Sequence, residues 1–572
     1  MDRNLLLAFA LSFLVLSLWS MLQEPPPPVP MESSPAGEIT EPSERMEQAV
    51  REPGQGSRYP ELGPPHEGPQ RAEAQAPREV GEPADVTREA ETIALERRHY
   101  HAELSSAGAS LRDWELLQYT DRHGDAIRLV AWGDAVPAAA TPFRELGPGD
   151  LSQRIWRVES RTDTEVRFST ESDGVVVRKT WSFPEDGYHF ELRIDVSNGS
   201  ERTIAPAFLT EWPFEKRPGN DFREQSAAAL EDGELEVTPL AGLGGAGFFG
   251  WFSGAKGGEP VELEGEIDWA GVQTPYFLSA LFPDQPKSAR ARFVSLEPGE
   301  IGAVQLYFEP VSLPPGQQAT RVYRGYLGPK EPRILEDFAP SALASIDLGW
   351  SFIAPMTRAF GWMLAVLYSF IPNYGWSIII LTILVRLVTA PLTIKQMKSM
   401  ERMRKIQPKV KAIQEKYKDD RQKQSEAMMS LYRQEKVNPL GGCFPMLLQL
   451  PVFIGLFYAL RSSIQLRQAP FIGWIDDLSA PDLLFTFPGL DFPVRALPVL
   501  MGASMFVQQK LTPMQMDPAQ ARMMLIMMPA MMTLISYTFP SGLVLYWMMS
   551  NVLAIAHQLW IGKHMEPAAK AS

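Results

Sequence analysis

The chain has 572 residues, 45% of them hydrophobic and 21% charged, and its formal net charge of −14 argues against a general nucleic-acid-binding protein. The single cysteine, Cys443, excludes a disulfide framework and a cysteine-based zinc site. The sequence contains no GxxxxGK[ST] phosphate loop, no GxGxxG motif opening a helix, no HExxH zinc motif and no GxSxG nucleophile motif, so the common nucleotide-dependent and hydrolytic enzymes are not indicated.

The N-terminal segment predicts a membrane anchor followed by a tether. Residues 4–22 are almost wholly apolar, follow Arg3 and precede the proline run Pro25–Pro28, without an Ala-x-Ala cleavage site. This pattern favours a retained transmembrane anchor at residues 1–22, with a cleaved signal peptide as the alternative. Residues 23–90 are rich in Pro, Glu, Gly and Ser and have no apolar period, so we expect a disordered linker there.

Residues 91–330 contain many short stretches in which apolar and polar residues alternate, such as Phe190-Glu-Leu-Arg-Ile-Asp-Val196, separated by turn signals such as Asn198-Gly199. A period of two is typical of half-buried strands, so this region predicts one large all-β sandwich domain. A cupin-like or lectin-like enzyme is the alternative, because His99 and His101 would lie on the same face of a strand and could bind a metal.

The C-terminal half is helical and apolar. Residues 377–393, apolar except for Arg386 and a few hydroxyls, and residues 437–460, which carry no charge, are each long enough to cross a hydrocarbon core of about 30 Å. Residues 523–562 carry no formal charge and are interrupted by Phe539-Pro-Ser-Gly542, which predicts two spans joined by a tight turn. With the anchor, the sequence predicts six spans, at residues 1–22, 376–394, 438–462, 490–511, 523–538 and 543–562.

Charge predicts the topology. Between Lys395 and Lys436 there are 13 Lys and Arg residues against 6 Asp and Glu residues, which places this segment in the cytoplasm. An odd number of spans must therefore separate it from the outer β-domain. One span, 376–394, satisfies this condition, so residues 331–375 are expected to hold an amphipathic helix, Ile346 to Ile371, along the outer membrane surface. The short tail, residues 563–572, is then cytoplasmic.

The cytoplasmic segment 395–437 has a helical apolar pattern, in which Met403, Ile406, Val410 and Ile413 recur every three or four residues. The pattern predicts a helical hairpin with a charged exterior, with Pro408 kinking or restarting the first helix. Because the segment is far longer than two adjacent spans need, it favours a docking surface for RNA, acidic lipid or a protein partner. A solvated connecting hairpin is the alternative.

Arg386 is the most informative residue of the membrane half. It lies ten residues after Trp376, about 15 Å deep at 1.5 Å per residue, close to the midplane of the bilayer. A cation there costs a few kcal/mol unless it meets water or a counter-charge, and the predicted multi-span segments contain no Asp or Glu. We therefore expect a water-filled cavity lined by uncharged polar residues, with snorkelling to an interface as the alternative. The candidates are Thr382, Gln449, Gln508, Gln509, Ser550, Asn551 and Gln558.

The fourth and fifth spans offer only about 14 to 16 core residues where about 20 are needed, so we expect the bilayer to be thinned around them. Methionines are concentrated between Met514 and Met532. Flexible thioethers suit a surface that adapts to many apolar partners, although packing against lipid is the alternative.

Three long motifs carry a family resemblance: Asn438-Pro-Leu-Gly-Gly-Cys-Phe-Pro-Met-Leu-Leu-Gln-Leu-Pro451, Gln468-Ala-Pro-Phe-Ile-Gly-Trp-Ile-Asp-Asp-Leu-Ser479 and Phe539-Pro-Ser-Gly-Leu-Val-Leu-Tyr546. They closely resemble the YidC/Oxa family of membrane protein insertases. Trp269-Ala-Gly271 with Tyr276-Phe277 looks like the periplasmic domain of the Gram-negative branch of that family. The resemblance covers the whole chain except the linker.

The resemblance implies a multi-span α-helical membrane protein of the bacterial inner membrane, with a five-helix core, an anchor helix and a periplasmic β-supersandwich. It implies a hydrophilic groove open to the cytoplasm and to lipid, in which Arg386 is the functional cation and Tyr546 is a further lining residue. It also implies that the cytoplasmic hairpin is needed for insertion. One departure is the tail, which is short here, whereas ribosome-binding members often carry a long basic tail.

The two lines of reasoning predict the same mechanism. A nascent membrane protein brings a polar or acidic tail into the groove, Arg386 attracts it, and the apolar segment slides sideways into lipid without a nucleotide, a metal or another cofactor. The expected partners are nascent clients, membrane lipids, the Sec translocon and, through the 395–437 hairpin, the ribosome. The alternatives are an ion-coupled transporter or channel with Arg386 as an anion site, and a structural anchor for an outer sugar-binding β-domain.

Overall fold

The computed structural model describes residues 89–131, 137–143, 150–217, 221–222, 224–243, 260–418, 420–435, 444–487, 492–511 and 518–569. The predicted anchor, residues 1–22, and the predicted linker as far as residue 88 lie outside the described residues.

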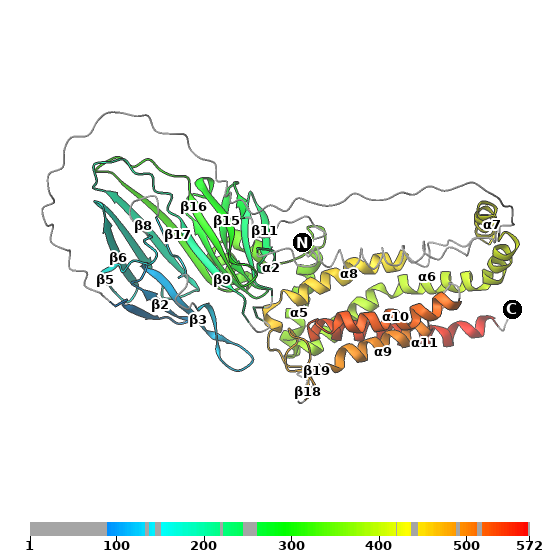
Figure 1. The fold of residues 1–572 in the computed structure, drawn as a ribbon. Coiled ribbons are helices and arrows are strands. Elements are labelled where there is room, and N and C mark those ends of the chain that lie inside the picture. The colour runs from blue at the N-terminus through cyan, green and yellow to red at the C-terminus, as the bar shows by residue number, and fades with distance from the viewer. Residues whose placement is uncertain are drawn as a thin grey trace, which may run out of the picture. The chain divides into compact units, whose positions relative to one another are not determined.

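The first part of the described chain is all-β, as the alternating pattern predicted. Its strands form a four-stranded sheet β1-β2-β3-β4, a nine-stranded sheet β11-β10-β13-β14-β17-β8-β7-β6-β5 and a four-stranded sheet β12-β15-β16-β9, with every pairing antiparallel (Figure 1). The strands are β1 (Thr92–Glu96), β2 (Tyr100–Ser105), β3 (Ser110–Thr120), β4 (Ala126–Ala131), β5 (Arg157–Arg161), β6 (Glu165–Ser172), β7 (Val175–Ser182), β8 (His189–Asn198), β9 (Thr210–Glu215), β10 (Ser226–Glu231), β11 (Glu234–Pro239), β12 (Val261–Leu263), β13 (Ile267–Gln273), β14 (Phe277–Pro283), β15 (Ala289–Glu297), β16 (Ile301–Phe308) and β17 (Gln318–Pro329). Two one-turn helices, α2 (Leu240–Leu243) and η2 (Pro286–Ser288), lie among them.

The burial of the strands explains the sandwich. In β8, Phe190, Leu192, Ile194 and Val196 are buried and their neighbours along the strand are more exposed, so one face meets the core. In β14 all seven residues are buried, because both faces are covered. Gly325 lies opposite Phe190, and a Cβ at this position would come within 2.1 Å of the Phe190 ring. The glycine therefore lets the ring lie across the neighbouring strand.

Lys179 of β7 is fully buried under the first sheet. Its ammonium donates hydrogen bonds to the carbonyl oxygens of Gly108 (2.8 Å) and Ala139 (2.9 Å) and lies 5.4 Å from the centroid of the Trp156 ring. Burial lowers the pKa of Lys179 well below its usual value. The side chain thus ties the loops next to β3 to the large sheet.

Between the β-domain and the helical part lie α4 (Pro332–Phe338), the turn η3 (Pro340–Ser345) and α5 (Ala354–Phe370). The amphipathic helix expected from Ile346 to Ile371 therefore starts later, at Ala354. Thr357, Phe360 and Leu364 form its buried stripe, whereas Trp362 and Phe370 are exposed. Both faces of α5 are thus largely apolar, which suits a helix between protein and lipid.

The remaining helices are α6 (Tyr374–Lys416), α7 (Arg421–Gln434), α8 (Phe444–Arg461), α9 (Ala496–Leu511), α10 (Pro518–Ser536) and α11 (Ser541–Ala569), with a 3-10 turn η5 (Ile464–Leu466) and a hairpin of β18 (Phe485–Phe487) and β19 (Phe492–Val494) in the loop before α9. Of these helices, α6, α8, α9, α10 and α11 run side by side, and α7 lies across the far end of α6 (Figure 1). Helix α11 packs against α6 and α9, and α9 also packs against α10. Helix α5 packs against α6 and α8. These contacts surround one apolar cluster. Helix α10 ends at Ser536 and α11 begins at Ser541, which confirms the expected tight turn between these two helices.

Two of the described helices are long and apolar enough to cross a membrane, over Tyr374–Ile394 and Ser541–Trp560. Leu450–Arg461 of α8 and Arg522–Ser536 of α10 are shorter apolar helices. The count of six spans stays a prediction.

The helix boundaries differ from the expected limits of the spans, as the following cases show. Helix α6 continues past residue 394 and contains both Pro391 and Pro408, so the helix does not restart at Pro408, and a kink there stays a prediction. Helix α9 starts at Ala496 rather than at residue 490, because β19 precedes it. Helix α11 continues to Ala569, so most of the predicted tail is helical.

The segment predicted to be cytoplasmic forms the expected helical hairpin from the end of α6 and α7. Met403 and Ile406 of α6 are buried, and Tyr432 of α7 packs against them. Asp420 caps α7 by accepting a hydrogen bond from the Lys423 amide at 3.0 Å.

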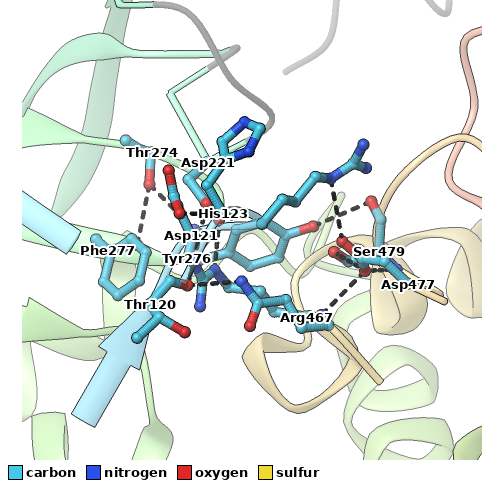
Figure 2. A network of polar contacts seen from close by, with 12 residues as sticks. Thr120, Asp121, His123, Asp221, Thr274, Tyr276, Phe277, Arg467, Asp477 and Ser479 are labelled. Atoms are coloured by element: carbon cyan, nitrogen blue, oxygen red, sulfur yellow. Dashed lines mark hydrogen bonds and ion pairs between the residues drawn. The ribbon is translucent and has the colours of Figure 1, made fainter. Parts of the chain in front are cut away.

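The loop after α8 is hydrogen-bonded to the β-domain (Figure 2). Arg467 donates to both carboxylate oxygens of Asp221 and to the Thr120 carbonyl, and its guanidinium lies 5.5 Å from the centroid of the Phe277 ring. The Tyr276 hydroxyl lies 3.5 Å from the Ser479 carbonyl oxygen. The described contacts therefore link the β-domain directly to the helical part.

Candidate functional site

Helix α6 carries Arg386 into the apolar bundle. The helix starts at the Asn373 cap, whose side chain accepts a hydrogen bond from the Trp376 amide at 3.2 Å, and no charged residue other than Arg386 occurs before Lys395. One guanidinium nitrogen, Nη2, donates to the Ser550 hydroxyl of α11. The Nε atom is buried and has no hydrogen-bond partner among the described residues. A buried donor of this kind is costly to leave unpaired, so the site can accept a further polar group or water.

Helix α11 supplies the side chains opposite Arg386. Tyr546, Ser550 and Asn551 are all buried, with 3%, 6% and 6% of their surface exposed. Tyr546 and Ser550 are four residues apart and therefore lie on the same face, one turn from each other. Three of the predicted polar residues thus lie together on the helix that contacts α6.

Ser504 of α9 extends this polar group, and it was missed by the sequence reasoning. The Asn551 amide nitrogen donates to the Ser504 hydroxyl at 3.1 Å, and that hydroxyl donates to the Met501 carbonyl at 2.6 Å. Ser504 could have been found from its position four residues before Gln508, on the same face of α9.

Thr382 lies one turn before Arg386 and is buried, but its hydroxyl donates to the Ile378 carbonyl of the same helix at 2.6 Å. Its hydrogen-bond donor is therefore already used within α6. Thr382 serves the site as a small buried neighbour of the arginine.

The glutamines are distributed differently. Gln509 of α9 donates to the Met528 sulfur of α10 at 3.2 Å, and its side-chain oxygen is buried without a partner. Gln508 is half-buried on α9, and Gln558 is half-buried two turns beyond Ser550 on α11. Gln449 belongs to α8, and its side chain lies outside the described residues. These hydrogen bonds bring together Arg386, Ser550, Asn551 and Ser504, with Gln509 at the junction of α9 and α10.

The metal-site alternative for the β-domain is not supported. His99 lies 2.6 Å from a carboxylate oxygen of Asp186, whereas His101 lies 2.8 Å from a carboxylate oxygen of Glu96. The two histidines thus pair with different acids, and the described residues contain no group of three or more His, Cys, Asp or Glu side chains that could hold a metal ion.

Comparison with known proteins matches both parts of the chain. Residues 92–362 match the family described as YidC periplasmic domain, and residues 366–569 match the family described as 60Kd inner membrane protein. The chain is 35% identical over 579 residues to the membrane protein insertase YidC of Pelobacter propionicus, covering 98% of this chain and 99% of that relative. It is 34% identical over 491 residues to the membrane protein insertase YidC of Geotalea daltonii, covering 83% and 87%.

Among solved structures, the chain is similar to an active YidC insertase with its first transmembrane domain resolved. The identity is 18%, the match covers 83% of this chain and 94% of that chain, and the TM-score is 0.35.

Proposed function

The chain belongs to the YidC family of membrane protein insertases, and on that premise we propose that Arg386 and its polar neighbours form the groove through which this insertase of the bacterial inner membrane receives its clients. The groove residues are Arg386, Thr382, Gln449, Gln508, Gln509, Tyr546, Ser550 and Asn551, with Ser504 added.

The observation that carries the proposal is the pairing of Arg386. Its guanidinium lies in an apolar span, contacts a neutral hydroxyl and keeps an unpartnered Nε. A structural arginine in a membrane bundle would be expected to pair with a carboxylate, and the described spans contain none. A cation held by neutral groups retains its attraction for an incoming anion.

The mechanism follows from charge and apolar length. A client's acidic or polar tail enters the groove from the cytoplasmic side and is attracted by Arg386, because a charge in a low-dielectric site acts strongly on a nearby opposite charge. The short apolar helices α9 and α10 reduce the apolar thickness that the tail must cross. The client's hydrophobic segment then moves sideways into lipid, and burial of its own apolar surface drives the last step.

Insertion of this kind is a partition between water and lipid, so it needs no nucleotide and forms no covalent intermediate. The partner class of the function is nascent membrane proteins. We extend the proposal to the Sec translocon and to the ribosome, the latter through the 395–437 hairpin. Support for the ribosome comes from the hairpin's excess of basic residues, among which Lys411, Lys418 and Lys423 are exposed. The names of the relatives give no support to the transporter or channel alternative.

The test compares Arg386→Ala and Arg386→Lys, with clients that carry either acidic or neutral tails. Insertion and protein abundance are measured together. The lysine variant should keep partial activity because an ammonium still attracts a carboxylate, although it lacks the planar fork. The alanine variant should lose insertion of clients with acidic tails at normal abundance.

Full insertion of every client by Arg386→Ala would refute the groove role of this residue. Loss of abundance in both variants would instead indicate that the arginine supports the fold.

A further inference from the structure

The loop before α9 contains a small hairpin whose large apolar side chains are exposed. The hairpin consists of β18 (Phe485–Phe487) and β19 (Phe492–Val494), and Leu483 and Leu484 lead into it. Leu483, Leu484, Phe485, Phe487 and Phe492 are each between 44% and 53% exposed. The described residues of this segment, 483–487 and 492–494, contain no charged side chain.

The aromatic side chains gather on one face. Phe485 and Phe487 are two residues apart on the same strand, and their ring centroids are 5.3 Å apart. Phe492 is the direct cross-strand partner of Phe487. Thr486 points to the opposite face, because successive side chains alternate. The hairpin therefore presents three phenylalanines together.

The base of the hairpin is fixed to the ends of two bundle helices. The Tyr537 hydroxyl, just after α10, donates to the Pro493 carbonyl, and its ring stacks on Phe492 at a centroid distance of 5.9 Å. The Arg495 guanidinium donates to the Tyr537 carbonyl and lies 4.7 Å from the centroid of the Tyr537 ring. The Asp482 carboxylate accepts hydrogen bonds from the Leu497 amide and the Trp474 indole, both at 2.9 Å.

These contacts also order the polar groups around the hairpin. Asp482 is buried, and Arg495 is held against Tyr537, so these two charged side chains lie at the base, where Phe492 also stacks on Tyr537. Phe485 and Phe487 pack on each other. The backbone of the two strands is paired, and the Leu484 amide adds a bond to the Val494 carbonyl at 2.9 Å. A paired backbone lowers the cost of moving the segment out of water.

The exposed apolar surface continues onto the membrane helices. Val499 and Leu500, in the first turn and a half of α9, are 57% and 46% exposed, and Leu534, at the end of α10, is 75% exposed. These side chains lie within about 10 Å of the hairpin along the helix axes, at a rise of 1.5 Å per residue. Exposed apolar side chains therefore lie at the ends of both helices next to the hairpin, where an inner-membrane protein meets lipid.

We propose that the β18–β19 hairpin is an interfacial anchor, which inserts Phe485, Phe487 and Phe492 among the outer-leaflet acyl chains just below the headgroups. Aromatic rings favour this zone, and an amphipathic segment lying in it sinks about 5–10 Å. The anchor holds the outer ends of α9 and α10 at a fixed depth. This role is separate from the groove at Arg386.

The test uses the full chain in vesicles of phosphatidylcholine and phosphatidylglycerol, with Cys443→Ser as background. A bimane label is attached to Phe485→Cys, to Thr486→Cys on the opposite face, or to Val237→Cys. Val237 is an exposed apolar residue of β11 in the β-domain and serves as the reference in water. Quenching is measured with a lipid that carries a nitroxide near the top of its acyl chain, and separately with iodide in the water.

We expect the lipid nitroxide to quench the position-485 label several-fold more than the position-237 label. Iodide should quench the position-237 label more than the position-485 label. The position-486 label should be quenched to an intermediate extent by both agents. Equal iodide quenching at 485 and 237 would place the hairpin in water and overturn the proposal. Weak quenching of the 485 label by both agents would mean that protein covers the face, a second copy or a client, and would overturn it as well. Leu483→Cys, also exposed, carries the label if Phe485→Cys accumulates poorly.

Discussion

Arg467 and Asp221, 246 residues apart in the sequence, form a two-point ion pair that joins the loop after α8 to the β-domain. Their side chains are 6% and 11% exposed, so the pair is largely removed from water. The same guanidinium also donates to the Thr120 carbonyl (Figure 2). Arg467 is therefore the central residue of this junction.

Replacing Arg467 with alanine should loosen the junction strongly. Removing one partner of a buried ion pair leaves an uncompensated charge and costs about 3–5 kcal/mol. We expect faster amide hydrogen exchange at Thr120 and in residues 467–479, with the centre of the β-domain unchanged. Arg122→Ala is the matched control, because Arg122 is 45% exposed and its nitrogen lies 3.7 Å from Asp477. Surface pairs of this kind contribute about 0–1 kcal/mol, so equal effects of the two variants would contradict the central role of Arg467.

Placing a carboxylate beside the groove cation should mimic its removal. In Ser550→Asp, the new carboxylate would lie within reach of the Arg386 guanidinium, which the Ser550 hydroxyl contacts now. Neutralised in this way, Arg386 should no longer attract acidic tails, while protein abundance is kept because the new pair is satisfied. Ser504→Asp, one helix further away, should have a smaller effect. Insertion of acidic-tailed clients is the measurement, and unchanged insertion by Ser550→Asp would argue against an electrostatic role.

The topology can be tested with single cysteines in the Cys443→Ser background. Cysteines at Lys411 and Arg522, both exposed, should be protected from a membrane-impermeant thiol reagent added outside, whereas one at Ile472 should react. Ile472 is chosen because it is 59% exposed, whereas Asp482 in the same loop is buried. Labelling at position 411 from outside would place the α6–α7 hairpin on the outer side, which requires a second span between it and the β-domain.

Lys330 should make stability depend on pH. Its ammonium is buried and donates to the Gln273 side-chain oxygen (2.6 Å) and the Ser345 carbonyl (2.8 Å). Burial lowers the pKa of Lys330 to about 7. The charge of Asp347 partly offsets this lowering, and the charge of Arg461 adds to it. Since the unfolded chain keeps a lysine pKa near 10.5, it binds more protons than the folded chain between pH 7 and 10.5. Stability from this group therefore rises with pH across that window and is lowest below pH 7.

The measurement compares the wild type with Lys330→Met. The wild-type free energy of unfolding should rise relative to the variant, by at most about 1.4 kcal/mol per pH unit, between pH 7.5 and 9.5. Parallel pH profiles for the two proteins would show that Lys330 keeps an ordinary pKa.

The sequence predicted the elements whose patterns are periodic or charged. Alternation along β8 indicated a strand with one buried face, and the interruption at Pro540 marked the turn between α10 and α11. Charge indicated the limits of α6 and α11 less well, because a charge shows where a helix leaves the membrane and not where it ends. Helix α6 therefore continues past Lys395, and α11 past Lys563.

Two features, the hairpin before α9 and the hydrogen bond of Ser504, could not be predicted from the sequence, each for its own reason. Strands of three residues are too short for a period to appear, and their apolar residues resemble the start of a span. Depth in the bilayer indicated Arg386, and its bond to the Ser550 hydroxyl agrees with a polar environment. The bond between Asn551 and Ser504 depends on how α9 and α11 pack, which local patterns do not encode.

The continuity of α6 gives the groove a mechanical connection to the cytoplasm. At 1.5 Å per residue, the 43-residue helix is about 64 Å long, with Arg386 about 18 Å from its start. A rigid rod that pivots at Tyr374 would move Arg386 sideways by about 0.3 of any displacement at Lys416, in proportion to these lengths. A shift of the α6–α7 tip by a few ångströms would thus displace the cation by about one, less any bending at Pro391 and Pro408, which lie between Arg386 and the tip.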